Sequence, residues 1–361
     1  EGNFNYLLLK SNVAQNVLKQ VDMSVSTFFK TIKDYKNNPN KYKSQPKFPK
    51  YKKEEYNLLT YTNHNCQIKD GFLILDRKNI KIKLPQQDKY NFKEFQQVRV
   101  IPKNDYFQIE IIYHSKELNL DLDQNKVSSI DFGVDNLITL VGSGINPLLF
   151  NGKPLKSYNQ FYNKQKAKLC SIKDKSKIKK YTKKLLILED NRNSFIKDYL
   201  HKVSRYVINT LIDNKIGTLV VGYNKQWKDS VALGNKTNQT FVYIPYHQLL
   251  SYLKYKCELV GIKMVETEES YTSKCSSLDF EAIQKHEEYA GNRVKRGLFK
   301  SNILNKVINS DVNGALNILR KVVDESLVRE IINSGLVFNP LKIRNPFHGC
   351  KLFENKTVKF S

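Results

Sequence analysis

Hydrophobic and polar positions change their spacing several times along the 361-residue chain. Over residues 11–36, apolar side chains such as Val13, Val17 and Val21 recur at helical spacing, which predicts one amphipathic helix. The next stretch, KNNPNKYKSQPKFPKYKK, contains three prolines and many lysines and indicates an extended basic loop. From residue 56 to residue 113 the spacing shortens to two, with β-branched and aromatic residues. This pattern predicts a small antiparallel barrel or sheet with a basic side.

The second half of the chain alternates between strand-like and helix-like segments. The stretch VSSIDFGVDNLITLVG predicts two apolar strands joined by a tight turn at Gly133. Residues 153–214 predict two long helices with a break near 171–177. Apolar strands at 218–223 and 262–267 then alternate with helices at about 243–259 and from Asp311 onward. Such alternation is typical of a mixed α/β domain.

These patterns divide the chain into four expected parts. Residues 1–55 would hold the helix and the basic loop, residues 56–125 the β-barrel, and residues 126–321 the mixed α/β domain. That domain would carry the helical hairpin at 153–214 and an irregular insertion at 274–309. Residues 322–361 would form a C-terminal tail. The expected fold class is therefore α/β plus β.

Composition adds a large positive charge to a chain that can build a core. Lys and Arg number 60 against 35 Asp and Glu, which leaves a net charge of +25, and 40% of residues are hydrophobic. A polyanion partner is expected, and nucleic acid is favoured because each Lys or Arg that neutralises a phosphate releases counterions. An anionic membrane surface is the alternative, but the charge is spread along the whole chain rather than gathered on one amphipathic helix. No segment reaches the roughly 18 uncharged apolar residues of a membrane span.

The basic residues expected to contact nucleic acid fall into the loop, the helical hairpin and the insertion. Between Lys164 and Lys184 there are ten lysines and one acid. A solvated surface is an equally good interpretation of any single cluster, although it does not explain the total. The candidates are Lys47, Lys50, Lys52, Lys53, Lys153, Lys179, Lys180, Lys183, Lys184, Arg293, Lys295 and Arg296. Phe28, Phe29 and Trp227 could stack on bases, but core packing is the preferred interpretation for each.

The five cysteines are scattered, odd in number and contain no CxxC pair. A disulfide framework is therefore not expected, and a reducing, cytoplasmic location next to the nucleoid fits the composition. The six histidines form no HxxxH or HExxH pair, so no zinc-hydrolase site is indicated.

Three acidic positions stand out by their context. Asp131 lies at the end of an apolar strand, Asp311 opens the helix DVNGALNILRKV, and Glu268 and Glu269 follow the strand IKMVET. Carboxylates that meet at strand ends can hold two Mg²⁺ ions for phosphodiester hydrolysis, because Mg²⁺ needs hard oxygen ligands. Singly, each acid has a simpler interpretation: a turn residue for Asp131 and a helix cap for Asp311.

Several stretches together resemble a known family. SIDFGVDNLITL, a long helical insert, EESYTSKC and SDVNGALNIL follow one another in the second half, and SNVAQNVLKQVD, PKFPKYKK and NGKPLKSYNQFYNK extend the likeness. In this order they resemble the TnpB (OrfB) proteins of insertion sequences, which are relatives of Fanzor proteins and type V CRISPR effectors. The resemblance covers most of the chain.

The resemblance implies an RNA-guided DNA endonuclease. Members of the family bind a guide RNA made from the transposon end, recognise a short motif beside the target, and cut double-stranded target DNA. They use one Mg²⁺-dependent (or Mn²⁺-dependent) RuvC site of RNase H-like fold, beside an N-terminal wedge barrel with a helical recognition insertion. Because members begin well upstream of EGNFN, the chain is expected to be a fragment that lacks the first barrel strand and part of that insertion.

Two departures from the family pattern affect the expected site. The second catalytic acid usually ends the strand TLVVGY, where this chain has Gly222, but a subset of relatives places it just before the later Thr-Ser motif. The resemblance therefore implies Asp131, Glu269 and Asp311 as catalytic metal ligands, with Glu268 as the alternative acid. The family's zinc ribbon needs two CxxC pairs, whereas the insertion at 274–309 contains only Cys275, so no zinc is expected.

Two other functions remain open from the sequence. Gly222 also fits a nuclease-dead, RNA-guided repressor that binds DNA without cutting it. A cut-and-paste transposase would join DNA ends without any RNA.

Overall fold

The computed structural model describes residues 4–51, 56–76, 80–84, 95–114, 117, 118, 120–223, 244–344 and 346. The chain forms two compact units, Glu1–Ser115 and Lys116–Lys359, and each is treated by itself below. Helices and mixed sheets confirm the expected α/β class. No helix in the described residues is long and apolar enough to cross a membrane.

The first unit begins with a short helix α1 (Phe4–Leu7) and the long helix α2 (Ser11–Asn37), which matches the predicted amphipathic helix. The predicted basic loop contains the 3-10 turn η1 (Pro39–Lys41), and its described part packs back onto α2. The rings of Phe28 and Phe48 meet edge to face at 5.2 Å, and Lys41 Nζ lies 2.7 Å from an Asp34 carboxylate oxygen. The loop is therefore held to the helix by aromatic and ionic contacts.

Two three-stranded antiparallel sheets complete the first unit. Their orders are β1-β5-β6 and β2-β3-β4. Asp70 and Gly71 adopt φ of 49° and 82° between β2 and β3, the positive values that a tight Asp-Gly hairpin turn needs. Both sheets and α2 contribute to one core, which contains Val13, Leu73 and Val98. The strands are β1 (Leu59–Thr62), β2 (Cys66–Lys69), β3 (Phe72–Leu75), β4 (Ile80–Lys83), β5 (Phe95–Pro102) and β6 (Phe107–Tyr113), with a 3-10 turn η2 (Asn63–Asn65) between β1 and β2.

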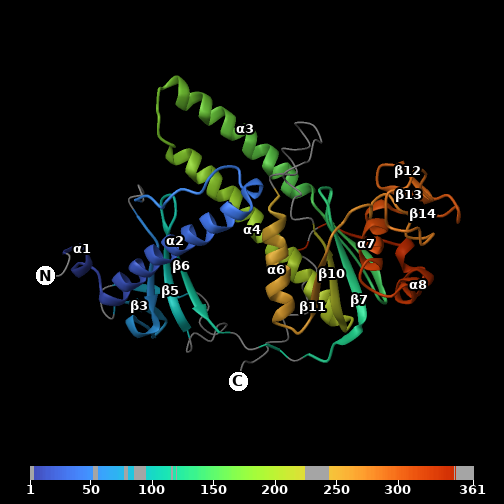
Figure 1. Cartoon of the computed structure of the whole chain (residues 1–361), viewed down its shortest axis with the longest axis horizontal. Helices are drawn as coiled ribbons and strands as arrows, with labels where there is room; N and C mark the ends of the chain where they lie inside the picture. The colour runs from blue at the N-terminus through green and yellow to red at the C-terminus, as the bar shows by residue number, and fades with distance from the viewer. Residues whose placement is uncertain are drawn as a thin grey trace. The chain divides into compact units, whose positions relative to one another are not determined.

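A six-stranded mixed sheet organises the second unit, in the order β11-β10-β7-β8-β9-β15 (Figure 1). Strands β7, β10 and β11 run parallel to one another, while β7, β8 and β9 form an antiparallel meander. The edge strand β15 runs parallel to β9. The strands are β7 (Asp123–Phe132), β8 (Asn136–Gly142), β9 (Ile145–Asn151), β10 (Ile216–Gly222), β11 (Lys263–Thr267) and β15 (Leu341–Ile343).

Helices cover both faces of this sheet. Helices α4 (Lys183–Asp213) and α6 (Tyr246–Glu258) pack on one face, and α7 (Ser310–Arg320) and α8 (Glu325–Asn333) pack on the other (Figure 1). Successive residues of β7 divide between the faces, because side chains alternate along a strand. Ile130 belongs to the α4–α6 core and Val127 to the α7–α8 core. Odd-numbered residues near the end of β7 therefore face α7.

Two additions extend from the sheet. Helix α3 (Lys153–Lys175) pairs with α4 to form a hairpin that extends away from the sheet (Figure 1). Residues between β11 and α7 form an irregular segment and a small antiparallel meander of β12 (Gly291–Lys295), β13 (Leu298–Ser301) and β14 (Val307–Asn309). Beyond α8, the 3-10 turn η5 (Leu336–Phe338) leads into β15, so residues expected in a tail contribute an edge strand.

Candidate functional site

Three parallel strands end at the same edge of the sheet. Asp131 is the penultimate residue of β7, Gly222 is the last residue of β10, and Glu269 comes two residues after β11. Val221 pairs with Ile130. The next residues along the two strands, Gly222 and Asp131, therefore lie side by side at the strand ends. The carboxyl ends of parallel strands are where open α/β sheets form their sites.

The Asp131 carboxylate faces α7. Ser129, two residues earlier on the same face, donates its Oγ hydrogen bond to the Ala315 carbonyl at 2.7 Å. A Cβ built on Gly314 would lie 2.7 Å from Asp131 Oδ2, closer than such contacts allow. Glycine at this helical position therefore leaves the space that the carboxylate occupies.

Glu269 fills the space above Gly222. A Cβ added to Gly222 would lie 2.7 Å from Glu269 Oε1 and 2.8 Å from Glu269 Cγ. The carboxylate of Glu269 thus lies beside the end of β10, although it is carried by the segment after β11. Glu269 Oε1 is buried and has no hydrogen-bond partner among the described residues.

The turn that carries Glu269 is held by side chains on one face of α7. Asn317 Nδ2 donates to the carbonyls of Thr272 (2.9 Å) and Cys275 (2.7 Å). One helical turn later, Lys321 Nζ donates to the carbonyls of Glu268 (3.1 Å) and Ser270 (2.9 Å). These bonds fix the main chain on both sides of Glu269.

The two neighbouring glutamates have different environments. Glu268 pairs with Lys321 and accepts a hydrogen bond from the Ser270 hydroxyl, and these contacts lower the pKa of Glu268 to about 2. Its side chain is 58% exposed. Burial raises the pKa of Glu269 to about 7, against the opposing charge of Lys321. The Glu268 carboxylate is therefore used in contacts that hold the turn. The Glu269 carboxylate keeps one oxygen without a hydrogen-bond partner among the described residues.

Asp311 lies in the first turn of α7 but does not cap it. Asn309 Oδ1 accepts hydrogen bonds from the amides of Asp311 (2.9 Å) and Val312 (3.2 Å) and is the N-cap. Asp311 Oδ2 instead accepts a 2.7 Å hydrogen bond from Asn136 Nδ2 at the start of β8. The helix-cap interpretation of Asp311 is therefore wrong, and its carboxylate is oriented by the strand that pairs with β7.

The three acids interact electrostatically. Burial is the main cause that raises the pKa of Asp131 well above its ordinary value, and the negative charges of Glu269 and Asp311 raise it further. The positive charge of Arg293 acts in the opposite direction. A carboxylate whose pKa is raised by burial and by neighbouring negative charges marks a functional-site candidate.

The donor set suits a hard divalent cation. All three groups are carboxylates, which Mg²⁺ prefers, and an orphaned buried Glu269 oxygen is a group that a cation would stabilise. Thr139 pairs directly with Asp131, and its buried Oγ1 also lacks a hydrogen-bond partner in the described part of the chain. As they stand, no three His, Cys, Asp or Glu side chains of the described residues form a ready metal-binding group. Binding a cation at these carboxylates would therefore need side-chain adjustment.

The predicted nucleic-acid contacts lie in three parts of the chain. Those described are exposed, namely Lys47 and Lys50 in the first unit, Lys153, Lys179, Lys180, Lys183 and Lys184 on the α3–α4 hairpin, and Arg293, Lys295 and Arg296 at β12. Lys52, Lys53 and Trp227 lie outside the described residues. Phe29 is 59% exposed, so its assignment to a core is wrong.

Several residues of the site were not anticipated from the sequence. Asn136, Gly314, Asn317 and Lys321 orient the acids or their backbone. A signal for part of this set exists, because Asn313, Asn317 and Lys321 recur every four residues beside the apolar face of α7. Polar side chains at that spacing share one side of a helix and can bind a single neighbouring segment.

Comparisons with known proteins find related families over most of the second unit. A family model for probable transposases of the OrfB/IS605 type matches residues 111–228, and a model for the TNB domain of Cas12f1-like proteins matches residues 246–318. The TnpB-like protein ORF457 of Acidianus two-tailed virus is 30% identical over 210 residues, covering 55% of this chain and 42% of that protein. The CRISPR-associated endodeoxyribonuclease Cas12f1 of Sulfoacidibacillus thermotolerans is 26% identical over 148 residues, covering 40% of this chain and 31% of that protein.

A solved structure has a similar fold. A Cas12f1–sgRNA–target DNA complex matches with a TM-score of 0.51 and 15% identity, over 78% of this chain and 67% of that chain. These matches support a TnpB-family protein related to the type V effectors, in agreement with the sequence motifs. The matched segments span less than half the length of the two curated relatives.

Proposed function

We propose that this protein is an RNA-guided DNA endonuclease that hydrolyses phosphodiester bonds at Asp131, Glu269 and Asp311, in a single RuvC site. The observation that carries the proposal is the Glu269 carboxylate, which occupies the space above Gly222 beside Asp131. A carboxylate at the end of β10 is what the nuclease requires, and here it comes from the neighbouring strand. The mixed sheet with helices on both faces is the framework that the RuvC interpretation needs.

Asp131, Glu269 and Asp311 would hold Mg²⁺ or Mn²⁺. When bound, such ions activate the attacking water and stabilise the leaving oxygen of the phosphodiester. The residues around the acids have separate tasks. Asn136 orients the Asp311 carboxylate, and Lys321 holds the turn that carries Glu269. Arg293, whose charge is felt at Asp131, would bind the anionic phosphate next to the carboxylates.

Guide RNA and double-stranded target DNA are the proposed partners. The chain has a net charge of +25, and the exposed lysines of the α3–α4 hairpin present much of it without any base-specific arrangement. Base pairing with a guide can supply sequence specificity while the protein contributes charge and shape. A guide made from the transposon end and a short motif beside the target follow from the family and complete the proposal.

The experiment purifies the full-length protein with its RNA and measures cutting of a motif-flanked DNA target. We expect cleavage in Mg²⁺ or Mn²⁺ and none in EDTA. Asp131→Asn and Glu269→Gln should abolish cutting while binding in a gel shift persists. The matched control is Glu268→Gln, which removes the adjacent carboxylate and should leave most of the cleavage.

The alternatives give different results in the same assay. DNA binding without cleavage by the wild-type protein would replace the nuclease with a guided repressor. Joining of DNA ends by a protein free of RNA would identify a transposase. Normal cutting by Glu269→Gln would show that the second acid lies elsewhere.

A further inference from the structure

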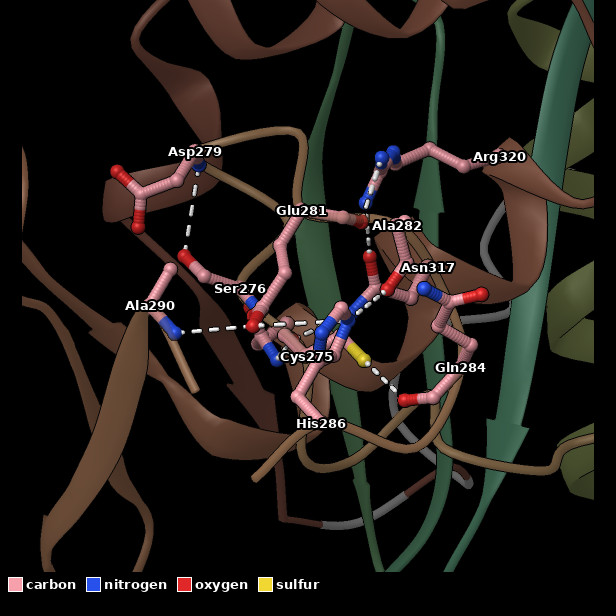
Figure 2. Close-up of polar contacts among 11 residues, drawn as sticks. Cys275, Ser276, Asp279, Glu281, Ala282, Gln284, His286, Ala290, Asn317 and Arg320 are labelled. Carbon is pink, nitrogen blue, oxygen red and sulfur yellow. Dashed lines mark hydrogen bonds and ion pairs between the residues drawn. The ribbon is translucent and has the colours of Figure 1, made fainter. Parts of the chain in front are cut away.

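The insertion between β11 and α7 contains a largely buried carboxylate, that of Glu281, which the nuclease site does not use. The side chain of Glu281 is 8% exposed. Its Oε2 accepts a 2.7 Å hydrogen bond from the Ser276 amide, and its Oε1 accepts a 2.9 Å hydrogen bond from the Ala290 amide (Figure 2). One carboxylate therefore joins two segments that are distant in the sequence of the insertion. Hydrogen bonds from backbone amides to an ionised carboxylate are among the stronger ones in proteins.

Groups that could otherwise serve as zinc ligands are also occupied by hydrogen bonds. Cys275 Sγ donates to the Gln284 carbonyl at 3.5 Å. His286 Nε2 lies 2.7 Å from the Ala282 carbonyl, and because a carbonyl only accepts, this nitrogen carries the proton. The same nitrogen lies 3.8 Å from Glu281 Oε1 (Figure 2). Nε2 of His286 is therefore not free to bind a metal.

Helix α7 holds this cluster from the other side. Arg320 donates to the Glu281 carbonyl at 3.0 Å, and its other nitrogen donates to Asn317 Oδ1 at 2.8 Å (Figure 2). Asn313 Nδ2 donates to the Cys275 carbonyl at 2.9 Å. The cluster around Glu281 is thus attached to the helix that also carries Asp311 and Gly314.

Ala290 leads directly into β12, which reaches the nuclease site. The Ala290 carbonyl accepts a 2.8 Å hydrogen bond from the Asn302 amide, which closes the base of the meander. At the far end of β12, the Arg296 side chain contacts Asp135 in the turn between β7 and β8. Arg293 lies on β12 between these two anchors, three residues before Arg296.

We propose that Glu281 replaces a structural metal ion in this insertion and acts as a positioning residue that sets β12 and Arg293 beside the carboxylates. The positioning step rests on the proposed nuclease function, whereas the metal-free closure of the insertion does not. Both carboxylate oxygens are needed to join the two segments of the insertion, because one accepts from the Ser276 amide and the other from the Ala290 amide. Glutamine offers one acceptor oxygen and cannot close both contacts.

The first test examines the closure of the insertion in the full-length protein bound to its RNA. Zinc should be absent by mass spectrometry, and a zinc-selective chelator should leave the melting temperature unchanged. Glu281→Gln should speed hydrogen exchange in the peptide containing Ala290, while the exposed control Glu287→Gln should leave it unchanged. One zinc ion per chain, or unchanged exchange in Glu281→Gln, would overturn the closure.

The second test separates positioning from general stability by a double-mutant cycle on cleavage. We expect Arg293→Ala to slow the cleavage step about 100-fold, as loss of one charge-stabilising donor does. Glu281→Gln should slow it about tenfold, and the double variant should be no slower than Arg293→Ala alone. If the two rate reductions multiply in the double variant, Glu281 does not act by positioning Arg293. If the wild-type protein does not cut at all, the proposed function fails, and exchange and zinc content still decide the closure.

Discussion

Glu269→Gln provides a quantitative test of how the relocated acid is held. The substitution keeps the shape of the side chain and removes its charge. In the metal-free protein the pKa of Glu269 rises from an ordinary 4.5 to about 7, chiefly through burial. That difference corresponds to about 3 kcal/mol against the ionised form. Because the side chain is only half-buried, we expect the measurable effect to be about 1–3 kcal/mol.

The size of the effect depends on pH. A carboxyl group with a raised pKa binds more protons in the folded state than in the unfolded state between the two pKa values. The wild-type protein should therefore lose stability relative to Glu269→Gln as the pH rises from 4.5 to about 7. Above pH 7 the full difference should be present, and near pH 4.5 it should vanish.

Urea denaturation in EDTA at pH 5 and pH 8 measures this difference. We expect Glu269→Gln to be the more stable protein at pH 8, with the order reversed when saturating Mg²⁺ is added, because only the wild type has the full ligand set. Glu268→Gln is the matched control and should lose up to about 1 kcal/mol at pH 8, since it breaks an exposed pair with Lys321. A Glu269→Gln protein that is less stable than wild type at pH 8 in EDTA would refute the reasoning.

Three further variants test residues other than the three acids. Gly314→Ala would place a Cβ 2.7 Å from Asp131 Oδ2. Because this contact displaces the carboxylate, we expect cleavage to be at least about tenfold slower. The melting temperature should not fall, because alanine favours the helix. Asn136→Ala removes the 2.7 Å donor to Asp311 and should raise the Mg²⁺ concentration needed for half-maximal cleavage about tenfold or more. Lys256 is 2% exposed, and burial lowers its pKa to about 7. Between pH 7 and 9 the unfolded chain therefore binds more protons at this lysine than the folded protein does. Relative to Lys256→Met, the free energy of unfolding of the wild type should rise by about 1.4 kcal/mol per pH unit over this range. A flat difference over that range would show that this lysine does not lose its proton inside the fold.

The relocation of one glutamate also bears on how the site could be redesigned. Gly222 and Glu269 share one space at the end of β10. A side chain at position 222 would therefore meet both Glu269 and Ile318, whose Cδ1 would lie 2.5 Å from the added Cβ.

The local pattern of the sequence was sufficient to predict the main elements. Apolar spacing predicted α2, the β7–β8 hairpin and the alternation of β10, α6, β11 and α7, because the side-chain periods of helices and strands are local properties of the backbone. The acids at strand ends could also be identified, since a carboxylate that interrupts an apolar strand needs a partner, a metal or solvent. The family motifs added an expected order of Asp131, Glu269 and Asp311.

The sequence could not show which of two adjacent glutamates is free. That choice depends on Lys321, which lies 53 residues after Glu268 and binds it, and on the space left by Gly222 in a different strand. Likewise, the closure of the insertion depends on Glu281 meeting the amides of Ser276 and Ala290. Charge and chemical type are carried by each residue, but hydrogen-bond partners, burial and pKa arise only when distant segments pack together.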